Sequence, residues 1–565
     1  MSRRVVIPSL LCITLAIVSP GVSSVVRAAA PSSSSPSAPS LVVVLVVDQL
    51  RGGMLEAIQP QLKGGFRRLL ESGRRFSRCH HDHSGTETGP GHATLLSGAH
   101  PSHNGIILND WHDRDTQRGV YCAGPAAPDA PTSFDGGVAI SSAFLTTESL
   151  ADSLRRAQPA ARIFTVSGKD RAAALTAGRG ANGVFWLSPR TGVFTSHPFF
   201  MESLPAWGAE FWGLGTPSAV ALRTGLPEEW TYPIRPAARA DDYPFEGHAY
   251  SRTSPHPIMQ ASAETLARDV RNRQLAARIF TSPWVDWMTL ELARRILKEE
   301  QLGRDTVPDL LVIGLTATDT VGHQYGPGSQ EHLDHLLRLD GWLEEFMKEA
   351  GAAASGHGRG VLYALSADHG VMDIPETRPG LRRVDEELFK DRFEEAMTAR
   401  LGKGPFLEAM HGTHLYLDRR TLERLRQPLE KAIDEARKVL STFWEVDRVY
   451  RASDLLTSGG GDPMLDLHRH SFTPERGGDI VLVPCEGCLF STRGYGTSHG
   501  TPWEYDRHVP MILSGAGILP GVVEETCRTI DLAPTLSQIL GIQFDSPRDG
   551  RPLPLSAVDT VHSRQ

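Results

Sequence analysis

LVVVLVVD, residues 41–48, is an unbroken apolar run, rich in β-branched valine, that ends in an aspartate. Two later runs have the same form, LLVIGLTATD at 310–319 and VLYALSADH at 361–369. Buried parallel strands have continuous β-branched sequences, because helices cover both faces of such sheets. Binding sites of open α/β sheets lie just beyond the carboxyl ends of the strands. The three runs therefore predict strands of one parallel sheet, with metal-binding residues along one edge.

The surrounding sequence alternates strand-like and helical patterns. A further strand is expected at 161–166, and helices are expected at 61–71, 284–300 and 330–350. This alternation is typical of an α/β protein with a parallel sheet between layers of helices. We therefore predict a central, mostly parallel sheet in an α/β/α sandwich.

Two stretches interrupt this alternation, about 180–265 and 376–490. The first is rich in Trp, Pro, Phe and Gly, and the second is a mixed segment. Segments inserted at the carboxyl edge of a sheet commonly cover its binding site. We therefore expect two insertions over that edge. The expected organisation is a core domain at 41–375 that contains the first insertion, a cap segment at 376–490, completion of the core at 491–556 and a tail at 557–565.

The first thirty residues have the layout of a secretory signal. Arg3 and Arg4 precede an apolar stretch at 5–18, and the small residues at 28–30 suit signal peptidase. A membrane anchor is the less favoured alternative, because the apolar stretch is short and contains a proline. We therefore expect a signal peptide at 1–30 and a Ser/Pro-rich linker at 31–40. The mature chain is expected in the periplasm or outside the cell, without stable membrane insertion.

Charge and cysteine content favour or exclude other classes of protein. The net charge of −8 and the pI near 6.3 provide no positive field for nucleic acid, so no nucleic-acid partner is expected.

Cys485 and Cys488 could form a redox or zinc motif, but no second CxxC accompanies them. We therefore favour a local disulfide between these two residues. Cys527 is predicted to be a buried core residue.

Six side chains of metal-binding type lie at or after the predicted strand ends. They are three carboxylates and three imidazoles: Asp48, Asp319, His323, Asp368, His369 and His499. A mixed oxygen and nitrogen set suits Zn²⁺ better than Ca²⁺ or Mg²⁺, which prefer oxygen ligands. One aspartate after a strand is usually a turn or cap residue, but the combination favours a metal centre. Six ligands are sufficient for two metal ions with open positions.

Thr88 precedes a Gly-Pro turn at the expected start of a helix. Its hydroxyl would lie at the positive end of that helix, where backbone N–H groups attract anions. A plain N-cap is the alternative role, and Thr86 and Ser84 are rival hydroxyls that do not adjoin the turn. A hydroxyl beside metal ions ionises near neutral pH and can then act as a nucleophile. The assignment of Thr88 as nucleophile thus depends on the metals.

Lys169 and Arg171 follow the strand predicted at 161–166. The chain contains only eight lysines, so a lysine at a strand end is less easily explained as surface decoration. A solvated surface pair is nevertheless the default interpretation of two such residues. If they face the metals, the lysine supplies a point charge and the arginine a fork for phosphate oxygens.

Several histidines are interpreted as structural. Residues 79–83, CHHDH, are dense in metal-binding side chains but precede Thr88, so we interpret them as strand and loop residues. A secondary metal site there is the less favoured alternative. His411 and His414, in the cap, are expected to be structural or lid residues. His92 is expected to support the Thr88 loop by hydrogen bonding.

Taken together, the motifs resemble the alkaline phosphatase superfamily, specifically its exported PafA-type branch with a threonine nucleophile. The resemblance extends from residue 42 to about 540 and is carried in order by VVDQLR, TGPGHATLLSG, IILNDW, SGKDRAA, TATDTVGH, SADHG and GTSHGTP. It implies an alkaline-phosphatase-like fold with inserted cap segments and two Zn²⁺ per chain. By this resemblance one Zn²⁺ is held by Asp319, His323 and His499, and the other by Asp48, Asp368 and His369 with Thr88.

The resemblance also implies a function. Asn109, Lys169 and Arg171 would bind phosphate, and small-molecule phosphate monoesters would be hydrolysed to inorganic phosphate through a phosphothreonine on Thr88. A phosphodiesterase of the nucleotide pyrophosphatase type is the alternative, because it shares the metal site and the threonine. The basic pair favours the monoester, whose dianion carries more charge. A sulfatase is disfavoured because the Cys/Ser-x-Pro-x-Arg pattern is absent, and a non-catalytic phosphate-binding protein because all six ligands and the hydroxyl are intact.

Overall fold

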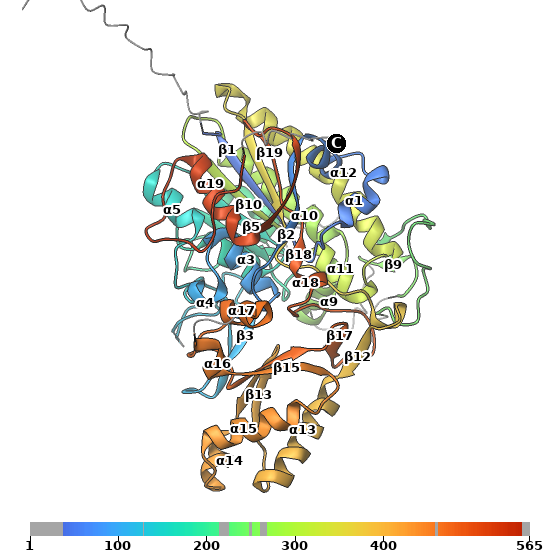
Figure 1. The fold of residues 1–565 in the computed structure, drawn as a ribbon. Coiled ribbons are helices and arrows are strands. Elements are labelled where there is room, and N and C mark those ends of the chain that lie inside the picture. Colours follow the sequence, from blue (N-terminus) through green and yellow to red (C-terminus); the bar gives the residue numbers. More distant parts are fainter. Residues whose placement is uncertain are drawn as a thin grey trace, which may run out of the picture. The chain divides into compact units, whose positions relative to one another are not determined.

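The core of the fold is a ten-stranded sheet. Figure 1 shows the computed structural model, with several strands of this sheet labelled. The structure describes residues 38–127, 129–213, 225–247, 251–259, 268–457 and 461–555. Five neighbouring strands are parallel and lie in the order β11 (Val361–Ser366), β1 (Leu41–Val47), β10 (Asp309–Leu315), β5 (Ile163–Ser167) and β6 (Gly183–Leu187). The prediction of a mostly parallel central sheet is therefore confirmed.

Antiparallel strands extend the sheet at both sides. β7 (Phe194–Thr195) pairs with β6 at one edge. Beyond β11 the order is β19 (Ile512–Gly515), β2 (Arg74–His80) and β18 (His508–Val509), and β20 (Gly521–Arg528) pairs with β2 in parallel. The C-terminal part of the chain therefore completes the core sheet.

The alternation of side chains along β1 explains the two helical layers. Leu41, Val43, Leu45 and Val47 face a cluster formed with α2 (Gly65–Ser72), α10 (Trp284–Glu299) and α12 (Gln330–Ala353). The intervening valines face α3 (Thr88–Ser97), α5 (Leu150–Ala157) and α19 (Leu532–Leu540). All seven residues of β1 are buried, as expected of a central parallel strand. The layers are those of the predicted α/β/α sandwich.

A second sheet lies within the segment expected to form the cap. Its strands follow the order β13 (Leu407–His411), β14 (His414–Leu417), β16 (Ile480–Pro484) and β15 (Val446–Arg451), and all neighbours are antiparallel. Its helices are α13 (Glu386–Leu401), α14 (Arg419–Arg424) and α15 (Leu429–Leu440). These elements share an apolar cluster of their own, around Phe389, Phe393 and Leu415.

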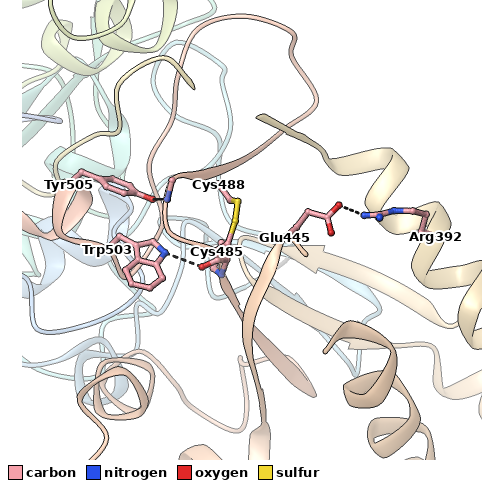
Figure 2. Close-up of a disulfide and its surroundings, with 8 residues drawn as sticks. Arg392, Glu445, Cys485, Cys488, Trp503 and Tyr505 are labelled. Atoms are coloured by element: carbon pink, nitrogen blue, oxygen red, sulfur yellow. Dashed lines mark hydrogen bonds and ion pairs between the residues drawn. A yellow bond between two sulfur atoms is a disulfide. The ribbon is translucent and has the colours of Figure 1, made fainter. Parts of the chain in front are cut away.

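The Cys485–Cys488 disulfide, drawn in Figure 2, joins the residue that follows β16 to the first residue of β17 (Cys488–Ser491). Two contacts beside it join the cap sheet to α18 (Glu504–Arg507). The Trp503 indole donates to Pro484 O at 3.0 Å, and the Tyr505 hydroxyl accepts from Gly487 N at 3.3 Å. The other cysteines of the described chain, Cys79, Cys122 and Cys527, are buried and free, which agrees with the core role predicted for Cys527.

Some predicted boundaries were wrong. The first insertion was expected from about residue 180, but β6 and β7 within it belong to the core sheet, because the run at 183–187 is apolar and buried on both faces. Ser40 was assigned to the linker, yet it is buried, and its carbonyl accepts from Asp309 N at 3.0 Å. The signal peptide at 1–30, residues 31–37 of the linker and the tail at 557–565 lie outside the described residues. No helix in the described ranges is long and apolar enough to cross a membrane.

The remaining α-helices and β-strands complete the connections between these elements. They are α1 (Met54–Ile58), α4 (Pro101–Asn104), β3 (Asp110–Asp113), β4 (Arg118–Tyr121), α6 (Asp170–Ala177), α7 (Ala209–Trp212), β8 (Glu229–Trp230), β9 (His256–Pro257), α9 (Arg268–Phe280), α11 (Ala317–Tyr325), β12 (Arg382–Asp385), α16 (Ala452–Leu456) and α17 (Pro463–His470).

Candidate metal centre

The six predicted ligands come from the carboxyl edge of the sheet and from a later loop. Asp48 directly follows β1, and Asp368 and His369 follow the neighbouring parallel strand β11. Because parallel strands end at the same edge, these three side chains meet. His499 lies in the loop before α18.

Asp319 does not end a strand, contrary to the prediction. β10 ends at Leu315, and α11 follows almost at once. The helix starts there because the carboxylate of Asp286, on α10, accepts from Thr316 N at 2.6 Å and from Ala317 N at 3.0 Å. Asp319 thus lies in the first turn of α11, and His323 lies one turn later on the same face.

The structure brings the six side chains together in two groups. Asp319, His323 and His499 form one, and Asp48, Asp368 and His369 form the other, with the ligand atoms of each group within 4.8 Å of one another. The His369 and His499 rings are stacked, with centroids 3.5 Å apart, so the two groups adjoin. This is the grouping that the resemblance implies.

Each histidine of the two groups is held by one ring nitrogen. Nδ1 of His323 lies 2.8 Å from Thr497 O, Nδ1 of His369 lies 2.9 Å from Gly370 O, and Nδ1 of His499 lies 2.7 Å from Thr86 O. A carbonyl partner keeps the proton on Nδ1, which leaves the Nε2 lone pair for another partner. Metal-binding histidines are commonly oriented in this way.

The charges of the site also fit a metal ion. Three carboxylates, Asp48, Asp319 and Asp368, are buried together. Burial and the charges of Asp319 and Asp368 raise the pKa of Asp48 well above its usual value. Asp48 Oδ1 and His369 Nε2 are buried and lie 3.5 Å apart, and neither makes a hydrogen bond within the described part of the chain. Bound cations would neutralise the carboxylates and fill these unused ligand positions.

Lys169 lies between the two groups. Its Nζ is 2.6 Å from Asp48 Oδ2 and 2.6 Å from Asp319 Oδ2. Burial lowers the pKa of Lys169, but the charges of Asp319 and Asp48 outweigh this effect and hold it above the usual value. The lysine is therefore a partly buried cation within the site, with its side chain 10% exposed.

Thr88 is the first residue of α3, and its side chain is buried. The N-cap residue is Glu87, so Thr88 is not the cap that the alternative interpretation required. Thr88 Oγ1 lies 3.3 Å from Lys169 Nζ and 3.3 Å from Arg171 Nη2. A Cβ at Gly91 would lie 2.1 Å from Asp368 O, so only glycine lets this helix approach the ligand loop so closely. Of the predicted hydroxyls, Thr88 alone faces both cations.

The neighbouring residues are held by hydrogen bonds. The Thr86 hydroxyl, a rival nucleophile, donates to Thr501 O at 2.8 Å. Asn109 Oδ1 accepts from Gly89 N at 2.7 Å, which fixes the amide beside the start of α3. His92 Nδ1 lies 2.9 Å from Thr88 O and 3.2 Å from Asp368 Oδ2, positions that allow the hydrogen-bonding role expected of this histidine.

Sequence reasoning missed Gln49. This residue is buried and has a positive φ of 67°. Its backbone N donates to Asp368 Oδ1 at 3.1 Å, and its side-chain amide donates to Asp319 Oδ1 at 2.7 Å. Gln49 thus links the two ligand groups. Its position directly after Asp48 at a strand end was the available signal.

The histidines interpreted as structural lie outside both ligand groups. His81 Nδ1 is 3.1 Å from His83 Nε2, and both rings are buried. His411 and His414 lie on the paired cap strands β13 and β14.

Comparisons with known proteins relate the chain to one family. The model of the type I phosphodiesterase / nucleotide pyrophosphatase family matches residues 42–508. Alkaline phosphatase PafA of Elizabethkingia meningoseptica is 30% identical over 528 residues, which cover 91% of this chain and 94% of PafA. Alkaline phosphatase PhoK of a Sphingomonas species is 29% identical, with 92% of this chain and 91% of PhoK covered.

Solved structures extend the likeness to the fold. The crystal structure of wild-type PafA matches with a TM-score of 0.82 at 28% identity and covers 91% of this chain and 98% of that chain. PafA has also been solved with a threonine, an asparagine, a lysine and an arginine substituted. In PafA the first two of these are 21 residues apart and the last two are 2 apart, as are Thr88 and Asn109, and Lys169 and Arg171, here. The chain therefore belongs to the type I phosphodiesterase / nucleotide pyrophosphatase family of the alkaline phosphatase superfamily and is an enzyme of the PafA-type branch.

Proposed function

We propose that the chain hydrolyses phosphate monoesters and releases inorganic phosphate, with Thr88 as the nucleophile. The observation that carries this proposal is the position of the Thr88 hydroxyl, 3.3 Å from Lys169 Nζ and 3.3 Å from Arg171 Nη2, beside two groups of metal-type ligands. The names of the relatives PafA and PhoK support the same activity.

The proposed cofactors are two Zn²⁺ per chain. Asp319, His323 and His499 would hold one ion. Asp48, Asp368 and His369, together with Thr88, would hold the other. Bound Zn²⁺ would favour ionisation of a nearby hydroxyl and attract the phosphate oxygens.

The side chains of the site would then position the phosphate and transfer the phosphoryl group to Thr88. Lys169, Arg171 and Asn109 would hold the nonbridging oxygens and align phosphorus with Thr88. Thr88 Oγ1 forms a bond to phosphorus, the bond to the ester oxygen breaks, and the alcohol leaves with a proton. Water then cleaves the phosphothreonine, which restores the hydroxyl and releases phosphate. Catalysis of this kind depends mainly on positioning and charge.

The charges of Lys169 and Arg171, both partly buried, favour monoesters over diesters. A monoester dianion carries one more negative charge than a diester on its nonbridging oxygens. Lys169 and Arg171 would gain more from the dianion, because electrostatic interactions are stronger at partly buried positions than in bulk water. A diester would leave one cation poorly matched.

Export of the mature chain is part of the proposal and is supported by the signal-like sequence at 1–30.

A substrate panel tests the proposal. The values of kcat/KM for an aryl phosphate monoester, a sugar phosphate and a bis-aryl phosphate diester would be measured with and without a chelator. We expect both monoesters to exceed the diester, the aryl monoester by about 100-fold, because a hydrogen bond to a charged group contributes about 1.5–3 kcal/mol. Chelation should abolish turnover, and added Zn²⁺ should restore it. A diester hydrolysed faster than either monoester would instead support the phosphodiesterase alternative.

A further inference from the structure

We propose that His80, Glu504 and His508 bind a further Zn²⁺ at the surface, outside the two ligand groups of the candidate active site. His80 ends β2 and His508 begins β18, and the two residues are direct partners in the antiparallel register. Glu504 is the first residue of α18, one helical turn before His508. One ligand atom from each residue lies within 4.8 Å of the others.

The two imidazoles are already oriented as metal-binding histidines are. His80 Nδ1 lies 3.2 Å from Arg78 O, and His508 Nε2 lies 3.0 Å from Ser77 O. These carbonyls take one ring N–H from each histidine, which leaves His80 Nε2 and His508 Nδ1. The two remaining nitrogens lie 2.7 and 4.0 Å from the same oxygen, Glu504 Oε1. The three donor atoms therefore lie within 4.8 Å of one another, and each imidazole has the outer contact that orients a metal ligand.

The composition and exposure of the cluster suit Zn²⁺. Two imidazoles and one carboxylate form a set that zinc accepts with water in the fourth position. The side chains of His80 and His508 are 16% and 27% exposed, and that of Glu504 is 66% exposed, so an ion can enter from solvent. Arg507, on the same short helix, donates a hydrogen bond from Nε to His81 O at 2.7 Å, so its guanidinium already has a backbone partner.

A second cluster, around His100, differs from this one in its ion pairs. His100 has a carboxylate at each ring nitrogen, with Nε2 2.9 Å from Asp82 Oδ2 and Nδ1 3.4 Å from Asp549 Oδ2. Asp82 also lies 3.6 Å from the Arg528 guanidinium. Asp82 thus already has an arginine partner, so we interpret this cluster as an ion-pair network. The exposed His103, 2.9 Å from Asp549, belongs to this network and provides a matched control.

An ion at His80, Glu504 and His508 would brace both ligand loops. Gly370, next to His369, donates its N–H to Asp506 O at 2.7 Å. Gly52, four residues after Asp48, donates its N–H to His508 O at 2.8 Å. The segment 504–508 therefore supports the loops that carry Asp48 and His369. Its attachment to β2 by a metal would stabilise the folded chain.

Metal content tests this inference without reference to turnover. Purified full-length protein would be equilibrated with buffered Zn²⁺ near neutral pH and its bound zinc counted by mass spectrometry. We expect the His80→Ala/His508→Ala double variant to hold one zinc ion fewer per chain than the wild type. His103→Ala should hold as many as the wild type. Equal zinc content in the wild type and the double variant would overturn the inference.

Thermal stability gives an independent readout. An ion that binds only the folded state raises Tm with its concentration. Once the wild type has been loaded to two equivalents, further Zn²⁺ should raise its Tm, and the same addition should have a smaller effect on Glu504→Gln, which changes only an exposed side chain. An equal rise in both proteins would show that Glu504 is not a ligand. This outcome is separate from any failure of the proposed phosphatase activity.

Discussion

At the scale of single residues, Lys169 and Arg171 make different contacts within the site. Lys169 contacts Asp48 and Asp319, one carboxylate from each ligand group, so its removal would disturb the metal ligands as well as the phosphate contacts. Arg171 contacts the Thr88 and Tyr121 hydroxyls instead. Arg171 is therefore the better position at which to test the charge of the substrate.

Arg171→Ala should lower kcat/KM for an aryl monoester by about 10–100-fold, because a charge-assisted hydrogen bond contributes about 1.5–3 kcal/mol. The loss for a diester should be smaller, since a diester carries less charge. Steady-state kinetics on both substrates measure this difference. Arg179→Ala, at an exposed arginine just after α6, is the matched control and should leave both values unchanged. Equal losses on the two substrates would contradict the charge argument.

Gln49→Ala should weaken metal retention, because Gln49 orients Asp368 and Asp319 by its two hydrogen bonds. Loss of such an outer contact typically costs about 10–100-fold in metal affinity. Chelator competition measures the change. Gln301→Ala is a matched control, because Gln301 also has a positive φ, of 54°, but is exposed and remote from the ligands. If both variants retain metal as the wild type does, Gln49 has no part in holding the ligands.

Residue chemistry could be predicted where a side chain is unusual for its place. The carboxylates and imidazoles at strand ends indicated the ligands, and SGKDR indicated the cations. Asn109 followed only from the family resemblance, since its local sequence suggests a turn. Gln49 was missed although it directly follows Asp48, because an uncharged amide acquires its role here only through contacts with Asp319 and Asp368, which lie 270 and 319 positions away.

At the scale of elements, the sequence predicted types better than boundaries. α10 and α12 begin at the expected residues, Trp284 and Gln330. The transition from β10 to α11 was missed, because it depends on Asp286, which reaches the backbone of 316–317 from another helix. A contact of this kind between separate elements leaves no local pattern in the sequence.

The cap sheet should show a defined dependence on pH. Burial lowers the pKa of His414, on β14, to about 3, below its usual value of 6.5. The folded state therefore resists a proton that the unfolded state accepts. The stability that this neutral histidine contributes is complete above pH 6.5 and is lost as the pH falls towards 3.

His414→Asn should reduce this loss, because asparagine can accept the hydrogen bond that His414 Nδ1 receives from Gly478 N but does not titrate. The slope of unfolding free energy against pH between about 5 and 6.5 should fall by up to about 1.4 kcal/mol per pH unit. Urea titrations at each pH measure it. His103→Asn should change the slope in the opposite direction, because the hydrogen bond to Asp549 raises the pKa of His103. An unchanged slope in His414→Asn would contradict the assignment.

At the scale of the whole molecule, one sheet edge and distant segments build the site together. Strand ends supply Asp48, Asp368 and His369, a helix supplies Asp319 and His323, and the late loop supplies His499. The fold class was predictable because long apolar runs alternate with helical patterns along the chain. The boundaries of the insertions were less predictable, since β6 has an apolar sequence that suits either the core or a lid.

Removal of metal should lower the stability of the whole chain. Without cations, three buried carboxylates face one lysine within the site, and unpaired buried charge is costly. We expect dialysis against a chelator to lower Tm by several degrees and Zn²⁺ to restore it, as measured by calorimetry. A Tm independent of chelator would contradict the assignment of the ligands.

The most direct measurement concerns the covalent intermediate on Thr88. The enzyme would be mixed with an aryl phosphate monoester, quenched in acid, digested and analysed by mass spectrometry. We expect phosphate on Thr88 in the wild type, phosphoserine at the same position in Thr88→Ser, and no phosphopeptide in Thr88→Ala, which should retain its metal. Phosphate on another residue, or full turnover by Thr88→Ala, would contradict the central claim.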